Sequence, residues 1–351
     1  MASLTTVAYQ TRKTINWSIL AVIVYVILRL FWGGLIIMWL TLFPPKPPPP
    51  NHAFDKLPSL EFPERSDIPE NITFTLETIE GSVPMASDSA YVYFMPKPAA
   101  NLLAITTTQD FAKKMHFNPT PIRETKNIYN FFDNEFSLRK LQYDIVSNNF
   151  ILRYNFENDI GIFREKQFKN PESAISETRA LLQNRNIYVP DLANGYAKLM
   201  YLKLTGNKLF PTTSLTNADA LKVDLFRGPV GDMEVMTPFP DDGQVSIIYS
   251  GSNNDKKRLV QLAYTFWPAD YNVNATYSLK TSEQAWQDLQ SGVGYIARAP
   301  SEGTEAIVRD VYLAYYDTFD PQMYMQPIYV FEGDHEFLGY VHAINPDWVG
   351  N

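Results

Sequence analysis

The chain lacks cysteine, and only four of its 351 residues are histidines. Without thiols, the sequence excludes disulfide scaffolds, cysteine nucleophiles, cysteine-ligated zinc and iron–sulfur clusters. The histidines are too few and too scattered to predict a metal site: His52, His116, His335 and His342. We therefore expect no resident metal and no cofactor.

Basic residues are scarce in the larger part of the chain. Residues 1–50 carry four Lys or Arg and no acid, so residues 51–351 hold 26 bases and 38 acids, a net charge of −12. An acidic surface lacks the basic footprint that binding to nucleic acid requires. With 45% hydrophobic and 19% charged residues, the chain can still build a hydrophobic core. The composition therefore indicates a folded, acidic body and excludes a nucleic-acid partner.

One long apolar run lies near the N-terminus. Residues 15–43 contain a single charge, Arg29, and about 20 apolar residues are enough to span a bilayer. The run is too long for a secretory signal peptide, and no small-residue cleavage site follows it. Pro44 and Pro45 end the helix, because proline lacks the amide proton and clashes with the preceding turn. The sequence therefore predicts a transmembrane helix over residues 15–43.

The charges that flank this run predict its orientation. Arg12 and Lys13 lie just before it, and only Lys46 follows closely on the other side. The positive-inside rule then places residues 1–14 in the cytoplasm as a short tail. We expect a single-pass protein of the cell membrane, with the lipid bilayer as its first partner and the C-terminal body outside.

Arg29 lies inside the apolar run, where a charge costs about 2.5–3.5 kcal/mol on insertion scales. In one interpretation the span begins near Val24, and the Arg29 side chain extends to the lipid headgroups. In the other, Tyr25, Arg29 and Gly33 recur every four residues and form one stripe on the helix. A polar residue beside a small one is typical of helix interfaces in membranes. This partner-helix stripe is a candidate contact with another membrane protein or with a second copy of the chain.

Proline dominates the segment after the run, because six of the seven residues 44–50 are prolines. Such a run favours polyproline II, a stiff spacer that rises about 3.1 Å per residue. Residues 51–70 remain rich in proline and polar residues. We expect residues 44–70 to form an extended stalk that lifts the body off the membrane.

The body alternates short strands with a few helices, which predicts an α+β fold with antiparallel sheets. A helix followed by a meander recurs along it. The helix expected over residues 277–292 opens with a capping box, in which the Thr281 hydroxyl and the Gln284 side chain satisfy the first amides. We expect three modules, over residues 71–168, 169–270 and 271–351.

The last module carries a pattern of apolar positions over roughly residues 276–345. A helix with Ala-Trp-Gln-Asp-Leu (285–289) precedes the segments Tyr-Leu-Ala-Tyr-Tyr (312–316), Gln-Pro-Ile-Tyr-Val-Phe-Glu-Gly (326–333) and Tyr-Val-His-Ala-Ile (340–344). This pattern resembles the C-terminal region of YycH/YycI-type extracytoplasmic proteins and, more loosely, the PepSY-like module. The resemblance implies cystatin-like α/β modules behind one membrane span, in a protein that regulates a histidine kinase and is not an enzyme. The chain also resembles uncharacterised membrane proteins of small-genome bacteria, for which no activity is implied.

The strands expected in this module are rich in tyrosine. Alternation places half of the side chains of a strand on each face. One interpretation is packing within the sheet through cross-strand pairs. The other is an exposed contact surface, since tyrosine is enriched at interfaces. The candidate residues are Tyr312, Tyr315, Tyr316, Tyr324 and Tyr329.

Patterns with catalytic or metal-binding chemistry are weak. Ser137 and Lys140 have the S-x-x-K spacing of serine acylases, but they lie in an alternating strand pattern, and the companion S-D-N and K-T-G motifs are missing. His335, Glu336 and His342 could be drawn as a metal site, yet a strand reversal is expected between the two histidines. We therefore predict no catalytic residue, no metal ligand and no enzymatic activity.

Three hypotheses about function follow. The first is a non-catalytic, membrane-anchored extracytoplasmic protein that binds or regulates through protein contacts. The second is a structural scaffold of the cell envelope or surface, and the third is an envelope protease inhibitor or hydrolase accessory protein. Stoichiometry separates the first two, because a scaffold is abundant and self-associating whereas a regulator is scarce and matched to its partner.

Overall fold

A computed structural model describes residues 4–42, 49–69, 71–79, 81–84, 87–99, 101–166, 168 and 170–350. The chain divides into two compact units, Met1–Pro48 and Pro49–Asn351. The second unit is a mixed α+β structure in which most of the regular elements are strands. The α+β class that the sequence predicts is thus confirmed.

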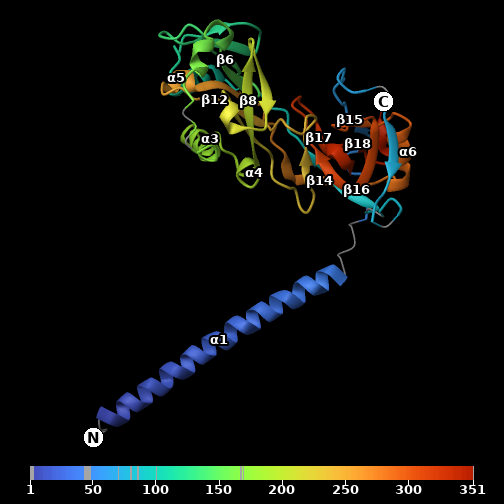
Figure 1. Ribbon diagram of the computed structural model, residues 1–351. Helices are drawn as coiled ribbons and strands as arrows, with labels where there is room; N and C mark the ends of the chain where they lie inside the picture. Colours follow the sequence, from blue (N-terminus) through green and yellow to red (C-terminus); the bar gives the residue numbers. More distant parts are fainter. Residues whose placement is uncertain are drawn as a thin grey trace. The chain divides into compact units, whose positions relative to one another are not determined.

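The described part of the first unit is a single helix, α1 (Leu4–Leu42), of 39 residues (Figure 1). Within it, Arg12–Ile36 is long and apolar enough to cross a membrane by length and composition. The helix begins earlier than the predicted residue 15, because no proline or glycine interrupts residues 4–14. Most of the predicted cytoplasmic tail is therefore helical and continuous with the predicted span.

A nine-stranded antiparallel sheet forms the first half of the body, in the order β4-β5-β6-β7-β13-β12-β10-β8-β9. Helices α2 (Ala104–Lys114) and α3 (Ser173–Asn184) contribute Phe111, Ala112, Ala174 and Leu182 to its main hydrophobic core. The strands are β4 (Ile122–Arg123), β5 (Ile128–Phe132), β6 (Arg139–Asp144), β7 (Phe150–Tyr154), β8 (Ala197–Thr205), β9 (Lys208–Thr212), β10 (Ala220–Leu225), β12 (Val245–Ser250) and β13 (Leu259–Tyr264). The short helices α4 (Pro190–Ala193) and α5 (Asp255–Arg258) lie in connections between its strands.

The first two predicted modules meet in this sheet. Strand β7 pairs with β13, with Leu152 opposite Leu262, so strands from residues 71–168 and from residues 169–270 share one ladder. They also share one core, in which Phe131 and Leu141 cluster with side chains from both sides of the predicted boundary. This pairing joins residues about 110 positions apart, a distance over which local sequence patterns carry no signal.

An eight-stranded sheet forms the second half of the body, with β11-β16-β17-β18-β15 as its main path. Strands β2 and β3, which precede the nine-stranded sheet in the sequence, pair here with β16, β14 and β17. The last module is therefore completed by residues from the first. The strands are β2 (Thr73–Leu76), β3 (Ser89–Phe94), β11 (Val235–Met236), β14 (Asp270–Ser278), β15 (Tyr295–Arg298), β16 (Glu305–Tyr316), β17 (Tyr324–Gly333) and β18 (Leu338–His342).

Helix α6 (Ser282–Gln290) covers part of this sheet and is shown beside β18 in Figure 1. Its start confirms the predicted capping box, since the Thr281 hydroxyl accepts from the Gln284 amide at 3.1 Å and the Gln284 side chain accepts from the Thr281 amide at 2.9 Å. Ala285 and Leu289 are buried against the sheet. The capping box thus fixes the start of the helix, and the apolar face of the helix packs on the sheet.

The predicted stalk over residues 44–70 is wrong for its second part. Residues 49–69 lie on the body, where β1 (Leu57–Pro58) pairs in parallel with β19 (Val349–Gly350). The Leu57 side chain is fully buried, and the His52 ring stacks on Trp348 at 3.6 Å. Isolated apolar residues thus hold the proline-rich segment 49–69 against the core. Residues 43–48, at the start of the predicted stalk, lie outside the described residues.

We predict that Leu57→Ala lowers the free energy of unfolding by about 2–3 kcal/mol, because a buried leucine is replaced by a cavity. Lys56→Ala, at an exposed neighbouring position, is the control and should change stability by less than about 0.5 kcal/mol. Urea unfolding of the full chain in neutral micelles measures both. Equal, small effects would mean that residues 49–69 are not part of the folded body.

Candidate functional site

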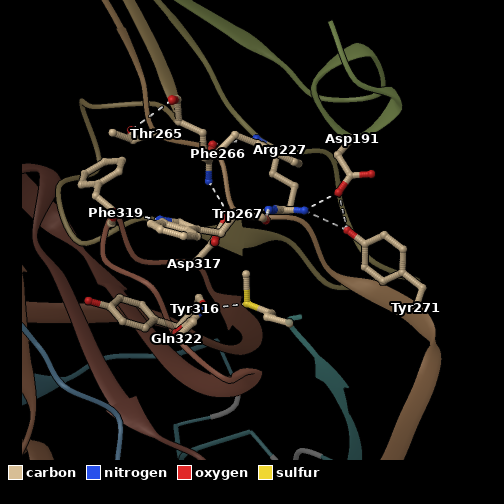
Figure 2. A network of polar contacts seen from close by, with 12 residues as sticks. Asp191, Arg227, Thr265, Phe266, Trp267, Tyr271, Tyr316, Asp317, Phe319 and Gln322 are labelled. Carbon is tan, nitrogen blue, oxygen red and sulfur yellow. Dashed lines mark hydrogen bonds and ion pairs between the residues drawn. The ribbon is translucent and has the colours of Figure 1, made fainter. Parts of the chain in front are cut away.

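A buried arginine joins the two sheets of the body. Arg227 follows β10 of the nine-stranded sheet, and its side chain is completely buried. Its Nε donates to Asp317 Oδ2 at 2.8 Å, just after β16 of the eight-stranded sheet. Its Nη1 pairs with Asp191 Oδ2 in α4 and donates to the Tyr271 hydroxyl of β14 at 3.1 Å. Figure 2 shows the guanidinium between these groups.

Neighbouring groups complete this cluster. Nη2 of Arg227 donates to the Trp267 carbonyl, and the guanidinium lies 4.4 Å from the centre of the Phe266 ring. The Gln244 side chain donates to Asp317 Oδ2 at 2.7 Å and accepts from the Arg227 amide at 2.9 Å. A buried arginine flanked by two carboxylates is stable only while all of its partners stay in place. The cluster therefore fixes how the two sheets meet.

The surroundings of the cluster shift the pKa values of Arg227 and Tyr271. Burial alone lowers the pKa of Arg227, but the charge of Asp317, the Tyr271 hydroxyl and the charge of Asp191 raise that pKa above its ordinary value. Burial raises the pKa of Tyr271, whose hydroxyl donates to Asp191 Oδ2 at 2.7 Å. Counted by formal charge, one arginine and two aspartates give the cluster −1.

A pocket opens on one side of this cluster, with a volume of about 370 Å³. The rings of Tyr91 and Tyr93 lie 6.0 Å apart, and the rings of Tyr93 and Tyr271 meet edge to face at 5.4 Å. Its wall consists of aromatic, amide and carboxylate side chains together with a glycine-rich segment after Arg227. The lining residues are Tyr91, Tyr93, Asp191, Asn194, Gly228, Pro229, Val230, Gly231, Tyr271 and Asn274.

Two glycines make the wall of this pocket possible. A Cβ atom on Gly195 would lie 1.8 Å from the Phe226 carbonyl oxygen, and one on Gly228 would lie 2.9 Å from the backbone of Asn194. The segment after α4 and the segment after β10 therefore cross in direct backbone contact. This crossing places Asn194 beside Asp191 of the cluster, where fixed polar groups in a small concave site are suited to binding a ligand.

The partner-helix stripe lies on α1. Tyr25 and Arg29 are exposed on the helix, and a Cβ added to Gly33 would meet no atom within 4 Å. The three residues share one face of the helix, as their spacing predicts.

The predicted contact surface of tyrosines is wrong for three of its five members. Tyr315, Tyr316 and Tyr329 are buried, while Tyr312 and Tyr324 are half-buried. Elements on both faces of the sheet cover them. The Tyr315 hydroxyl donates to the Tyr91 carbonyl at 3.0 Å, and the Tyr329 hydroxyl donates to the Lys280 carbonyl at 2.7 Å. Packing within the sheet, the alternative interpretation, describes these three residues.

The site residues that sequence reasoning missed come from four distant segments. Asp191, Tyr271 and Asp317 show no local pattern that links them. Arg227 does carry a signal, because it follows the apolar pair Leu225 and Phe226 at the end of β10, and a charged residue at such a place is buried only when it is paired. That signal marks one member of the cluster but names no partner.

The two histidines of the possible metal site are separated in the structure. His335 is exposed on the turn after β17, whereas His342 Nε2 lies 2.9 Å from Gln326 Oε1 inside the sheet. In the part of the chain that the structure describes, no group of three or more His, Asp or Glu could hold a metal ion.

The His342 environment predicts a pH dependence. Burial, with a smaller contribution from Lys280, lowers the pKa of His342 from 6.5 to about 3. A lowered histidine pKa means that the stability it contributes is present above about pH 6.5 and is lost as the pH falls toward 3. Between pH 7 and pH 5 we expect wild type to lose about 2 kcal/mol more than His342→Gln, which keeps a donor but does not titrate. Urea unfolding at both pH values measures this difference.

His335→Gln is the control for this experiment, because it removes an exposed histidine from the same region. It should lose as much stability as wild type between pH 7 and pH 5. If His342→Gln shows the same loss as wild type, His342 does not set the acid sensitivity.

Comparisons with known proteins return little. No protein-family model matches the chain, and no curated protein matches it. Among solved structures, the chain is similar to an uncharacterized protein from Eubacterium rectale ATCC 33656, with 13% sequence identity and a TM-score of 0.41. The match covers 79% of this chain and 90% of that chain. A likeness this distant supports no statement about function.

Proposed function

We propose that the chain is a non-catalytic, membrane-anchored binding protein whose body recognises a protein partner through the pocket beside the Arg227 cluster. We call this pocket the junction pocket. The observation that carries this proposal is the pocket itself, in which Tyr91, Tyr93 and Tyr271 stand beside the braced carboxylate of Asp191. Rigid aromatic side chains next to a few fixed polar groups are the usual composition of a recognition site.

The membrane part of the proposal rests on α1. Its apolar stretch is long enough to span a bilayer, and Arg12 and Lys13 before that stretch favour a cytoplasmic N-terminus. The body then lies outside. The resemblance of residues 276–345 to YycH/YycI-type proteins and to the PepSY-like module supports the same plan, with a regulatory rather than an enzymatic role.

The partner-helix stripe gives the proposal a second contact. Tyr25, Arg29 and Gly33 lie on one face of α1, and the small residue lets a second helix approach closely. In this scheme the pocket recognises the partner outside the membrane, and the stripe contacts a helix of the same partner within it.

Site-specific photocrosslinking tests the pocket. A photoreactive amino acid replaces Asn194, exposed on the pocket wall, or Asn217, exposed at the opposite end of β10, in the full chain in its native membrane. We expect a defined protein adduct from position 194 and none from position 217. Identical adducts from both positions, or none from either, would contradict the proposal.

The stripe is tested in the same membranes with Arg29→Leu at equal expression. We expect the adduct from position 194 to persist while crosslinks within the membrane to the same partner are lost. Unchanged crosslinks within the membrane would assign Arg29 to the lipid headgroups. Only crosslinks between copies of the chain would favour an envelope scaffold instead.

A further inference from the structure

The one charged side chain that lines the junction pocket is acidic. Of the ten residues that line the pocket, Asp191 alone is charged, and none is Lys, Arg or His. The four segments that supply these residues, 89–94, 190–195, 228–234 and 270–275, contain three further acids and no Lys, Arg or His. The neighbouring Arg227 is completely buried and is held by Asp191 and Asp317. The ligand therefore meets negative charge without an accessible cation, in a body whose net charge is already −12. The three further acids are Asp232, Glu234 and Asp270.

Asp191 offers one oxygen to a ligand. Its Oδ2 accepts from Arg227 and from the Tyr271 hydroxyl. Its other oxygen points away from the guanidinium in Figure 2, and the side chain is 21% exposed. A single acceptor suits an ammonium group, which is a compact point charge, better than a guanidinium, which pairs with both oxygens of a carboxylate.

The tyrosines of the pocket can attract a cation through their aromatic rings. The negative face of an aromatic ring attracts an ammonium group within about 6 Å of its centre. Tyr93 and Tyr271 meet nearly at right angles, with 80° between their planes, and Tyr91 extends the wall as the most exposed of the three. Three tyrosine rings and a carboxylate thus line one pocket.

We propose that the junction pocket binds the ammonium group of a lysine side chain presented by the protein partner. This inference rests on the proposed function and names the feature of the partner that is recognised. The Asp191 oxygen accepts from the ammonium group, and the tyrosine faces surround the methylene stem and the charge. A volume of about 370 Å³ accommodates such a side chain, and the acidic body draws a basic surface toward it.

The test uses small probes and the full chain in micelles of a neutral polyoxyethylene detergent. Saturation-transfer NMR titrations compare Nα-acetyl-lysine methylamide with the same compound acetylated at Nε, which removes the charge but keeps the stem. N-acetylglucosamine is the third probe, because aromatic and amide groups also suit sugars. We expect the charged lysine probe to bind at least tenfold more tightly than either neutral probe, and added salt to weaken it.

Two variants at one position separate the ring from the hydroxyl. Tyr91→Phe keeps the aromatic face and should change the affinity for the lysine probe by less than twofold. Tyr91→Leu keeps the bulk without the face and should weaken binding about five- to tenfold. Neither variant alters the Arg227 cluster, since the Tyr91 side chain is not among its partners.

Equal binding of the charged and acetylated probes overturns the inference, and so does preference for the sugar or equal affinity of both variants. Failure of the lysine inference can be distinguished from failure of the proposed function. If no lysine probe binds while position 194 still captures a partner, the ligand class is wrong and the binding role stands. If neither occurs, both proposals fall.

Discussion

Replacing Arg227 with leucine should lower the free energy of unfolding by about 3–5 kcal/mol. The substitution removes a fully buried cation and leaves Asp317, itself 1% exposed, without the charge that compensates it. Removing one partner of a buried ion pair carries this cost because the remaining charge stays uncompensated in the interior. Urea unfolding of the full chain in micelles, with the variant at matched concentration, measures the loss.

Arg258→Leu is the matched control. Like Arg227, Arg258 donates two hydrogen bonds to carboxylate oxygens, here both of Glu177, at 3.0 and 2.7 Å, but the two side chains are 21% and 39% exposed. A pair open to water contributes about 0–1 kcal/mol. If both variants lose the same stability, the Arg227 cluster does not hold the sheets together.

Replacing Gly195 with alanine should cost more than about 3 kcal/mol and abolish capture of the partner. The added Cβ would lie 1.8 Å from the Phe226 carbonyl oxygen, a backbone atom that cannot turn aside as a side chain can. The segments after α4 and β10 must then separate, which places the cost at or above the upper end for overpacking. Separation also moves Asn194 and Asp191 away from the pocket wall. Unfolding by urea and photocrosslinking from position 194 measure the two effects.

Gly161→Ala serves as the comparison for steric cost. There the added Cβ lies 3.2 Å from Oδ1 of Asp159, a side-chain atom that needs to shift by only a few tenths of an ångström. We expect a loss below about 1 kcal/mol and unchanged capture of the partner. A Gly195→Ala protein as stable as Gly161→Ala would show that the two backbone segments do not cross so closely in solution.

The sequence predicts those parts of the fold that local chemistry decides. The apolar run becomes α1, and Thr281 with Gln284 forms the capping box at the start of α6. The predicted stalk fails for residues 49–69, because two isolated apolar anchors, Phe54 and Leu57, outweigh the surrounding prolines. Contacts with strands more than 200 residues away hold these anchors, and composition does not report them.

The candidate site escapes prediction for the same reason. Arg227 meets Asp191 across 36 positions and Asp317 across 90, so no motif spacing links the three. The tyrosines of β16 and β17 cluster in the sequence and are therefore candidates for a contact surface. In the structure, packing of the sheet buries Tyr315, Tyr316 and Tyr329. The tyrosines that line the pocket, Tyr91, Tyr93 and Tyr271, come from two strands of the completed sheet.

The measurement that tests the central claim most directly is capture of the partner by Tyr91→Ala in the native membrane, with stability measured in parallel. Tyr91 lines the pocket and is 39% exposed, so its loss should change stability by less than about 1 kcal/mol. Phe210→Ala removes a somewhat more exposed aromatic, at 49%, from β9, outside the pocket. We predict that Tyr91→Ala abolishes capture from position 194 while Phe210→Ala leaves it unchanged. Capture at the wild-type level by a stable Tyr91→Ala protein would contradict the account.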